Sequence, residues 1–182
     1  MSGEQTPAVD LADFRLGMSR LASGVSVVAT GSADDPAGWR GMTATAVSSL
    51  CADPPSLVAC LNRGTGTYRE LRHNSLFSVN LLSSRDVALA RTFAGQDVFG
   101  AERFAPDAWS TGTLGVPVLA GALASFECRV SRSVDHGTHA LLIGAIASIR
   151  WMDEASSGPL IYHRHEFRDL GAEVGVTGGS AT

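Results

Sequence analysis

The chain has 182 residues, of which 45% are hydrophobic and 18% charged, and its formal net charge is −4. These values predict one folded domain with a sizeable core, and they exclude a disordered chain or two full-sized domains. The charge argues against a nucleic-acid-binding surface, and no apolar run reaches the ~18 residues that would span a membrane. The N-terminus lacks the basic start and apolar core of a signal peptide, so we expect a cytoplasmic protein.

All 14 basic residues are arginine, and the chain contains no lysine. This excludes Schiff-base chemistry and a P-loop, because both need a lysine amine at the site. A phosphate-binding site in this chain would have to use arginines, hydroxyl groups and backbone N–H groups.

The first half of the chain predicts one helix and several strands. Asp10 is placed to cap a helix in which apolar residues recur at helical spacing until Gly24. Residues 25–30 predict a strand, which a turn-rich loop follows. Residues 40–50, RGMTATAVSSL, alternate as one further strand, and residues 56–62 predict another.

The middle of the chain predicts two short helices around a strand. Thr67 and Glu70 have the spacing of a capping box, which predicts a helix start at Thr67. A strand over 76–82 and a helix over 83–93 follow. Residues 95–118 form a long segment, and a loop of that length is uncommon unless it covers something.

Two long antiparallel strands, over 122–130 and 138–152, and a short strand in PLIYHR complete the pattern. Six or seven strands, two or three helices and no regular βαβ alternation favour a mainly β, antiparallel barrel over a Rossmann sheet. We expect the domain to cover residues 10–170, with disordered ends at 1–9 and 171–182.

The strand over 40–50 is the first candidate for a binding surface. By the two-residue period, Thr43, Thr45, Val47 and Ser49 share one face. Small side chains let a flat ligand lie against the backbone, and hydroxyl groups can donate and accept. A flavin isoalloxazine ring needs such a surface along its pyrimidine edge. The alternative is a threonine-rich strand that faces solvent.

The glycine turn in NRGTGTYRE, residues 62–70, is the second candidate. Free N–H groups at a helix start could hold the phosphate of a flavin nucleotide, with Arg63, Thr65 and Thr67 around it. The fragment is not the GxGxxG fingerprint, and an ordinary helix cap remains the alternative.

Four of the five histidines form two close pairs, His136 with His139 and His163 with His165. They could bind zinc, but no cysteine or carboxylate spacing completes a familiar ligand set, so we expect no metal. His139 follows the flexible Gly137 at a strand start and could contact a ligand, whereas a surface role is the default for His165. The sequence offers neither a catalytic triad nor a G-x-S-x-G elbow, so hydrolase chemistry is not indicated.

Taken together, these elements resemble the flavin reductase domain family, the small reductase components of two-component flavin monooxygenases. The matching segments follow the family's order from about residue 14 to 168: FRLGMSRLASGVSVVAT, GMTATAVSSL, DPPSLVACLNRGTGT, FSVNLLSS, LARTFAG, GALASFECRV, GTHALLIGAI and PLIYHR. The resemblance implies a Greek-key split barrel with a few flanking helices, and a homodimer with the flavin near the subunit interface.

The resemblance also implies site residues. In the family the strand matching Met42–Ser49 lines the isoalloxazine ring, and the segment matching 62–67 approaches the ribityl phosphate. A Gly-Asp-His motif associated with nicotinamide binding corresponds to 137–139, with Thr138 in place of the aspartate. Thr45 stands where many members have asparagine. The implied cofactor-binding residues are Met42, Thr43, Ala44, Thr45, Ser48, Ser49, Asn62, Arg63, Thr65, Thr67, Phe93, His139, Tyr162 and His163, with His139 as the catalytic candidate.

The function implied is NAD(P)H:flavin oxidoreduction, with FMN or FAD as the flavin and NADH or NADPH as the donor. Hydride would pass from nicotinamide C4 to flavin N5, and reduced flavin would leave for a partner monooxygenase. No side-chain nucleophile is needed; N–H groups and hydroxyls near 43–49 would stabilise charge on the flavin N1–C2=O edge. A flavin-dependent reductase of another acceptor, such as a corrinoid or a nitroaromatic compound, and a non-catalytic flavin-binding protein are the alternatives.

Overall fold

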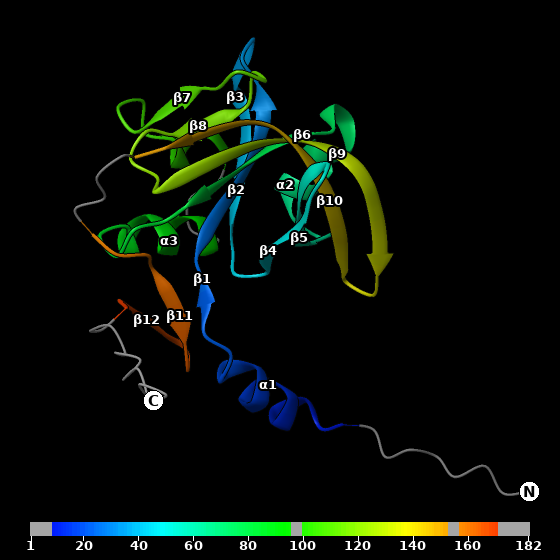
Figure 1. Cartoon of the computed structure of the whole chain (residues 1–182), viewed down its shortest axis with the longest axis vertical. Coiled ribbons are helices and arrows are strands. Elements are labelled where there is room, and N and C mark those ends of the chain that lie inside the picture. The colour runs from blue at the N-terminus through cyan, green and yellow to red at the C-terminus, as the bar shows by residue number, and fades with distance from the viewer. Residues whose placement is uncertain (1–8, 96–99, 153–156, 171–182) are drawn as a thin grey trace, which may run out of the picture.

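The computed structural model describes residues 9–95, 100–152 and 157–170, and it is mainly β (Figure 1). The helices are α1 (Leu11–Ser19), α2 (Gly66–Asn74), α3 (Val87–Ala94) and the short 3-10 helix η1 (Gly100–Arg103). The strands are β1 (Ser23–Gly24), β2 (Ser26–Ser32), β3 (Asp35–Ala44), β4 (Val47–Ala52), β5 (Pro55–Asn62), β6 (Leu76–Leu81), β7 (Trp109–Thr111), β8 (Pro117–Leu119), β9 (Ala124–His136), β10 (His139–Trp151), β11 (Ile161–His163) and β12 (Glu166–Arg168). The ends predicted to be disordered lie, apart from Val9, outside the described residues.

The main sheet has seven antiparallel strands in the order β3-β2-β6-β9-β10-β5-β4. β3 and β4 are its two edges, yet only Thr45 and Ala46 separate the end of one from the start of the other. So short a link spans only about 10 Å, because an extended chain advances roughly 3.3–3.6 Å per residue. The sheet therefore curls until its edges approach each other. The prediction of a mainly β, antiparallel fold is confirmed, and the curled sheet is open between β3 and the β4–β5 pair.

The prediction of one continuous strand over 40–50 is wrong. β3 ends at Ala44, and the chain crosses from one edge of the sheet to the other before β4 begins at Val47. Ala46 lies in the crossing, where its carbonyl accepts a hydrogen bond from Cys60 N at 2.9 Å. The two-residue period is interrupted there, so Thr43 does not continue onto a face shared with Val47.

The inside of the curled sheet is an apolar core that α2 closes at one end. Tyr68 and Leu71 of α2 pack with fully buried residues of the sheet, among them Leu61, Phe77 and Leu142. Burying each of these large side chains contributes roughly 1.5–3 kcal/mol. This core fixes the start of α2 against the end of β5.

A second core lies on the outer face of β2 and β3, where α3 and the segment after it pack. Phe93, Phe104 and Trp109 form edge-on or tilted aromatic contacts with centroids 4.8–5.4 Å apart. The long segment over 95–118 was expected as a loop, but its described part contains η1, β7 and β8. Two of its aromatic residues do cover the sheet, because Phe104 and Trp109 are 7% and 4% exposed.

Two predicted helix boundaries are wrong for tertiary reasons. Asp10 does cap α1, since its carboxylate accepts from Ala12 N at 2.7 Å, but the helix ends at Ser19 rather than near Gly24. Residues 23–24 instead form β1, which pairs with β11. Similarly, residue 83 does not open α3, because Ser83 lies in an isolated bridge with Pro159 and the helix starts at Val87.

The start of α2 also differs from the prediction. Thr65, not Thr67, is the N-cap, and its hydroxyl accepts a hydrogen bond from Tyr68 N at 3.2 Å. Thr67 lies within the first turn and is 3% exposed. The turn at Gly64 places the cap two residues earlier than the capping-box spacing suggested.

Candidate functional site

Two contiguous pockets lie beside the opening of the curled sheet. The first, here called the arginine pocket, has a volume of about 780 Å³ and is lined by β3, the β5–α2 turn, the end of α3 and η1. The second, the aromatic pocket, has a volume of about 810 Å³ and lies between α3 and the β11–β12 hairpin. Thr43, Ala94 and Gly95 line both, so the two pockets form one elongated site.

The arginine pocket is defined by Arg40, Arg69 and Arg103, which line it together with Thr65 and Thr67. Arg40 Nη1 donates to the carbonyls of residues 37 and 39, and Arg69 Nη1 donates to the carbonyl of residue 64 at 3.1 Å. Arg103 Nη2 donates to the carbonyl of residue 95 at 2.5 Å. These bonds hold three guanidinium groups around one cavity, an arrangement suited to a phosphate group.

Arg103 is half-buried, and loss of solvent lowers the pKa of its guanidinium from the ordinary value of 12.5. Partial desolvation strengthens the attraction of a positive charge for an anion beside it. The motifs in the sequence indicated none of these three arginines. The available signals were that Arg40 directly precedes the GMTATA stretch and that a chain without lysine must use arginine for phosphate.

The N-terminus of α2 opens into the same pocket. Gly64, Thr65 and Gly66 line it, and the first N–H groups of a helix have no partners within the helix. Thr65 Oγ1 donates to Asn62 O at 2.8 Å, which fixes the turn that precedes the helix. The helix dipole adds to the positive potential of the arginines at this point.

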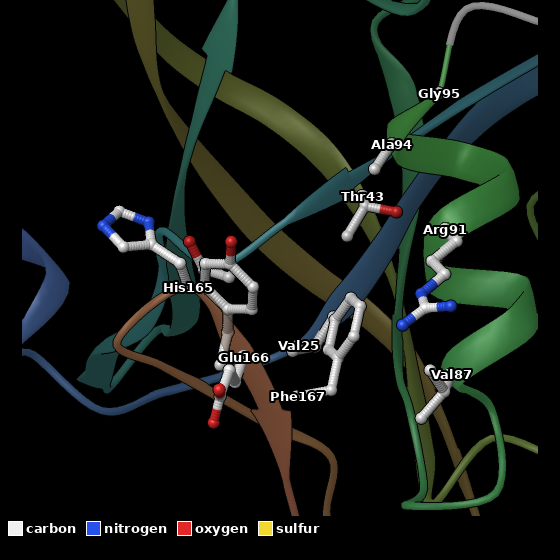
Figure 2. Close-up of a pocket in the computed structure, with 11 residues that line it drawn as sticks. Val25, Thr43, Val87, Arg91, Ala94, Gly95, His165, Glu166 and Phe167 are labelled. Atoms are coloured by element: carbon white, nitrogen blue, oxygen red, sulfur yellow. The ribbon is translucent and has the colours of Figure 1, made fainter.

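Figure 2 shows the aromatic pocket, with Val87 and Arg91 on α3 facing Phe167 on the hairpin. Tyr162 and Phe167 are in T-shaped contact with centroids 5.3 Å apart. The Arg91 guanidinium carbon lies 5.9 Å from the centre of the Phe167 ring, within the range of a cation–π contact. His165, expected as a plain surface residue, also lines this pocket. The walls suit a flat aromatic ring next to the arginine pocket.

The structure brings about half of the predicted site residues together. The arginine pocket contains Met42, Thr43, Asn62, Thr65, Thr67 and Phe93. The aromatic pocket contains Thr43, Thr45 and Tyr162. The others lie outside both linings: Ala44, Ser48, Ser49, Arg63, His139 and His163.

These outlying residues fall into distinct places. Ala44 is buried in the inner core, and Ser48 and Ser49 are exposed on β4. His139 is exposed at the start of β10, where it pairs with Asn62 of the arginine pocket. Asn62 therefore lies directly between the arginine pocket and His139.

Thr138 contacts the His139 imidazole. Its Oγ1 lies 2.9 Å from His139 Nδ1, so a hydroxyl stands where the family motif has a carboxylate and still supplies a hydrogen-bond partner. Within the described residues, no group of three histidine, cysteine, aspartate or glutamate side chains could hold a metal ion.

Among the described helices, none has the length and apolar character needed to cross a membrane.

Comparison with known proteins identifies the family of the chain. The model of the family described as "Flavin reductase like domain" matches residues 18–171. The chain belongs to this family. The resemblance inferred from the sequence segments is therefore confirmed.

Three similar proteins illustrate the family. The FMN reductase (NADH) RutF of Stutzerimonas stutzeri is 39% identical over 158 residues, 87% of each chain. The solved structure of BorF, the flavin reductase component of a bacterial two-component tryptophan halogenase, has a TM-score of 0.81 at 28% identity and covers 90% of this chain and 100% of its own. The Streptomyces globisporus NADH:FAD oxidoreductase SgcE6, solved with NAD and FAD fragments, has a TM-score of 0.80 at 25% identity and covers 93% of this chain and 100% of its own.

Proposed function

We propose that this chain is an NADH-dependent flavin reductase that supplies reduced flavin to a flavin-dependent oxygenase. The observation that carries the proposal is the joined pair of pockets, one positively charged and rich in hydroxyl groups, the other aromatic. A flavin nucleotide has the matching parts, a phosphate at one end and a flat ring system at the other. Membership of the flavin reductase family and the NADH-dependent activity named for the RutF relative support the same conclusion.

The chain's own residues bind and orient the reactants. Arg40, Arg69 and Arg103 hold the flavin phosphate, with the N-terminus of α2 behind it. A bound flavin supplies the ring atom that accepts hydride from the nicotinamide. The main task of the residues around it is to align the two rings, because such alignment can supply a large share of the rate enhancement.

Thr43 stands where the two pockets meet, so we place the isoalloxazine ring over it. Its hydroxyl donates to Ala90 O at 2.6 Å, which keeps the oxygen of Thr43 oriented and able to accept. Tyr162 and Phe167 form the apolar wall opposite α3, against which an aromatic ring can pack.

We also propose that the active form is a homodimer. The outer faces of β5 and β10 carry a row of partly exposed apolar residues: Val58, Cys60, Leu141 and Ile143. α1 has no buried residue, and Figure 1 shows it leading away from the body of the protein. Extensive exposed apolar surface of this kind marks a protein interface. Because Ser48 and His139 lie on the same outer face, a second copy covering it would enclose these two predicted site residues, which the pockets leave out.

The flavin and the acceptor follow from the relatives. RutF is named for FMN, whereas SgcE6 is named for FAD, so FMN is our first choice because RutF is more similar in sequence to this chain. BorF is the flavin reductase component of a two-component tryptophan halogenase. We therefore propose a flavin-dependent monooxygenase or a related oxygen-using enzyme as the partner.

The test is to mix the purified protein with NADH and excess FMN or FAD and to follow the absorbance of the reduced nicotinamide. We expect NADH oxidation to rise with added flavin and saturate. Flavin binding without NADH or NADPH oxidation would overturn the proposal and leave a flavin-binding carrier. Turnover only of tightly retained flavin with a third acceptor would instead indicate a reductase of that acceptor.

A further inference from the structure

In the β9–β10 hairpin, which carries His139, only β10 has a second neighbouring strand near the turn, because it pairs with β5 as far as His139. β6 pairs with β9 only over Ala124–Arg129, so nearer the turn β9 is paired, among the described strands, with β10 alone. Figure 1 shows β9 continuing past β6 toward this turn. Segments with exposed backbone hydrogen bonds and few buried contacts open locally at low free energy. The β9 side of the turn, which precedes His139, therefore depends on contacts outside the sheet to stay in place.

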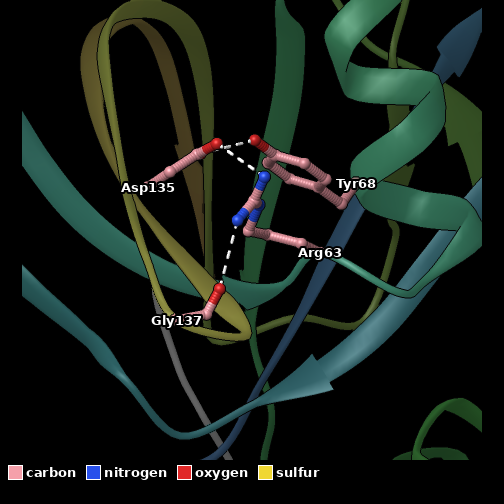
Figure 3. Close-up of polar contacts among 4 residues, drawn as sticks. All are labelled: Arg63, Tyr68, Asp135 and Gly137. Carbon is pink, nitrogen blue, oxygen red and sulfur yellow. Dashed lines mark hydrogen bonds and ion pairs between the residues drawn. The ribbon is translucent and has the colours of Figure 1, made fainter.

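A polar network supplies that constraint (Figure 3). Arg63 Nη2 lies 2.9 Å from Asp135 Oδ2, and Arg63 Nη1 donates to Gly137 O at 3.1 Å. Tyr68 Oη donates to Asp135 Oδ1 at 2.9 Å. The backbone also participates, because Arg63 N donates to Thr138 O at 2.9 Å. We call Arg63, Tyr68, Asp135 and Gly137 the turn network.

The turn network connects the arginine pocket to the hairpin. Asn62 and Thr65 line the pocket, but the side chain of Arg63 points to the other side and reaches the turn. Its charge is matched by Asp135 rather than directed at the phosphate-binding site. The sequence position of Arg63 suggested a phosphate ligand, whereas its contacts indicate a structural role beside the site.

The geometry of the turn network favours rigidity over net stabilisation. The Arg63 and Asp135 side chains are 42% and 40% exposed, and an ion pair that exposed contributes little stability. However, the planar guanidinium makes bonds to two different residues of the hairpin, and Tyr68, which is 5% exposed, anchors the same carboxylate. Gly137 has φ +53°, a conformation that glycine adopts without strain, and the bond from Arg63 restrains its carbonyl at this flexible position.

We propose that Arg63, Tyr68 and Asp135 are positioning residues for His139. They hold the turn so that the imidazole, with Thr138 on its Nδ1, keeps one orientation toward the nicotinamide. The inference rests on the proposed flavin reductase function, because it assigns His139 to the nicotinamide. It goes beyond that function by giving Arg63 a role in donor binding and none in flavin binding.

The principal test is Arg63→Ala, assayed for both substrates. We expect KM for NADH to rise about tenfold or more, since a small displacement of a positioning group has effects of up to about 100-fold. The dissociation constant for FMN, measured by quenching of flavin fluorescence, should change less than about twofold, because Arg63 does not line the arginine pocket. If Arg63 bound phosphate instead, FMN affinity would fall while riboflavin affinity would not, and the proposal would be overturned.

Conservative variants separate positioning from simple loss of fold. Tyr68→Phe removes one hydroxyl and Asp135→Asn removes one charge, and each should raise KM for NADH with kcat changed less. Because the groups act together, Arg63→Ala combined with Asp135→Asn should cost less than the product of the single effects. The matched control is Arg129→Ala, because Arg129 is an exposed arginine on β9, the strand that carries Asp135. This variant should leave KM for NADH and the dissociation constant for FMN unchanged. Strictly multiplicative effects would count against a shared network.

A measurement without turnover distinguishes failure of this inference from failure of the proposed function. Amide hydrogen exchange over residues 135–139 should be faster in Arg63→Ala than in the wild-type protein, whether or not NADH is oxidised. Unchanged exchange there would overturn the turn network itself. Faster exchange in a protein that never oxidises NADH would uphold the network and reject the reductase.

Discussion

At the residue scale, Arg103 places a partly desolvated guanidinium in the arginine pocket. We predict that Arg103→Gln lowers FMN affinity about tenfold or more, because hydrogen bonds to charged groups contribute roughly 1.5–3 kcal/mol. Riboflavin lacks the phosphate and should bind both proteins about equally. Titration of flavin fluorescence measures both constants, with the exposed Arg150→Gln as the control. An equal loss for riboflavin would mean that Arg103 supports the fold rather than the phosphate.

Gly41 illustrates how closely β3 approaches the aromatic cluster. A Cβ atom at this position would lie 2.7 Å from Phe93 Cε1 and 3.1 Å from Phe104 Cζ. We predict that Gly41→Ala lowers the free energy of unfolding by about 1–3 kcal/mol, the usual effect of overpacking. Urea denaturation measures the change. Gly17→Ala is the control: no heavy atom lies within 4 Å of the added carbon, and alanine favours the helix, so this variant should be neutral or more stable.

Sequence reasoning predicted several residues of the site but not which arginines belong to it. Hydroxyl-bearing patterns indicated Thr43, Thr65 and Thr67, the family resemblance indicated Met42, and all four line a pocket. Arg63 was indicated by its place between them, yet its side chain points to the hairpin. The direction of a long side chain at the end of a strand depends on tertiary contacts, which a local motif does not contain.

At the element scale, the β11–β12 hairpin forms one wall of the aromatic pocket and has an unfavourable turn. Arg164 and His165 have φ values of +51° and +65°, which cost energy for residues with a Cβ. We predict that Arg164→Gly raises the thermal midpoint. The gain in the free energy of unfolding should stay below about 1 kcal/mol, because glycine also increases the entropy of the unfolded chain. Arg168→Gly, in the extended strand β12, is the matched control and should lower the midpoint. The reverse order would show that the turn carries no strain.

Elements with clear alternation were predicted well. The strands predicted over 25–30, 56–62 and 76–82 correspond to β2, β5 and β6 within one or two residues. These strands are buried in the sheet, so their apolar pattern reflects the fold directly. The break between β3 and β4 could not be predicted in this way, because both halves alternate and only the curl of the sheet separates them.

At the scale of the whole molecule, the strand order could not be derived from local patterns. β9 lies between β6 and β10, and β3 and β4 end at opposite edges despite being neighbours in the chain. Such pairings depend on long-range contacts, and the family resemblance, not periodicity, pointed to the split barrel. The arginine pocket lies beside the opening that results from this strand order. The same long-range pairings that determine the topology therefore also create the site.

The last prediction concerns the proposed homodimer. Leu141 and Val134 are cross-strand partners on the outer face near His139, and they are 37% and 45% exposed. In an isolated chain, Leu141→Asp would have little effect on folding, because the side chain is already partly in water. In a dimer it would bury an unpaired carboxylate in the interface, which costs several kcal/mol. We therefore predict that light scattering gives twice the 18.9 kDa chain mass for the wild-type protein and the single mass for Leu141→Asp.

A matched control fixes the location of the interface. Ile149 is a somewhat more exposed aliphatic residue, 45% against 37% for Leu141, near the far end of the same strand β10. Ile149→Asp should remain dimeric and active, whereas Leu141→Asp should lose NADH oxidation together with the dimer, since Ser48 and His139 share its face. A monomeric but fully active Leu141→Asp protein would show that one chain holds the complete site. Dissociation by Ile149→Asp alone would place the interface at the other end of β10, and His139 would then have to act within its own subunit.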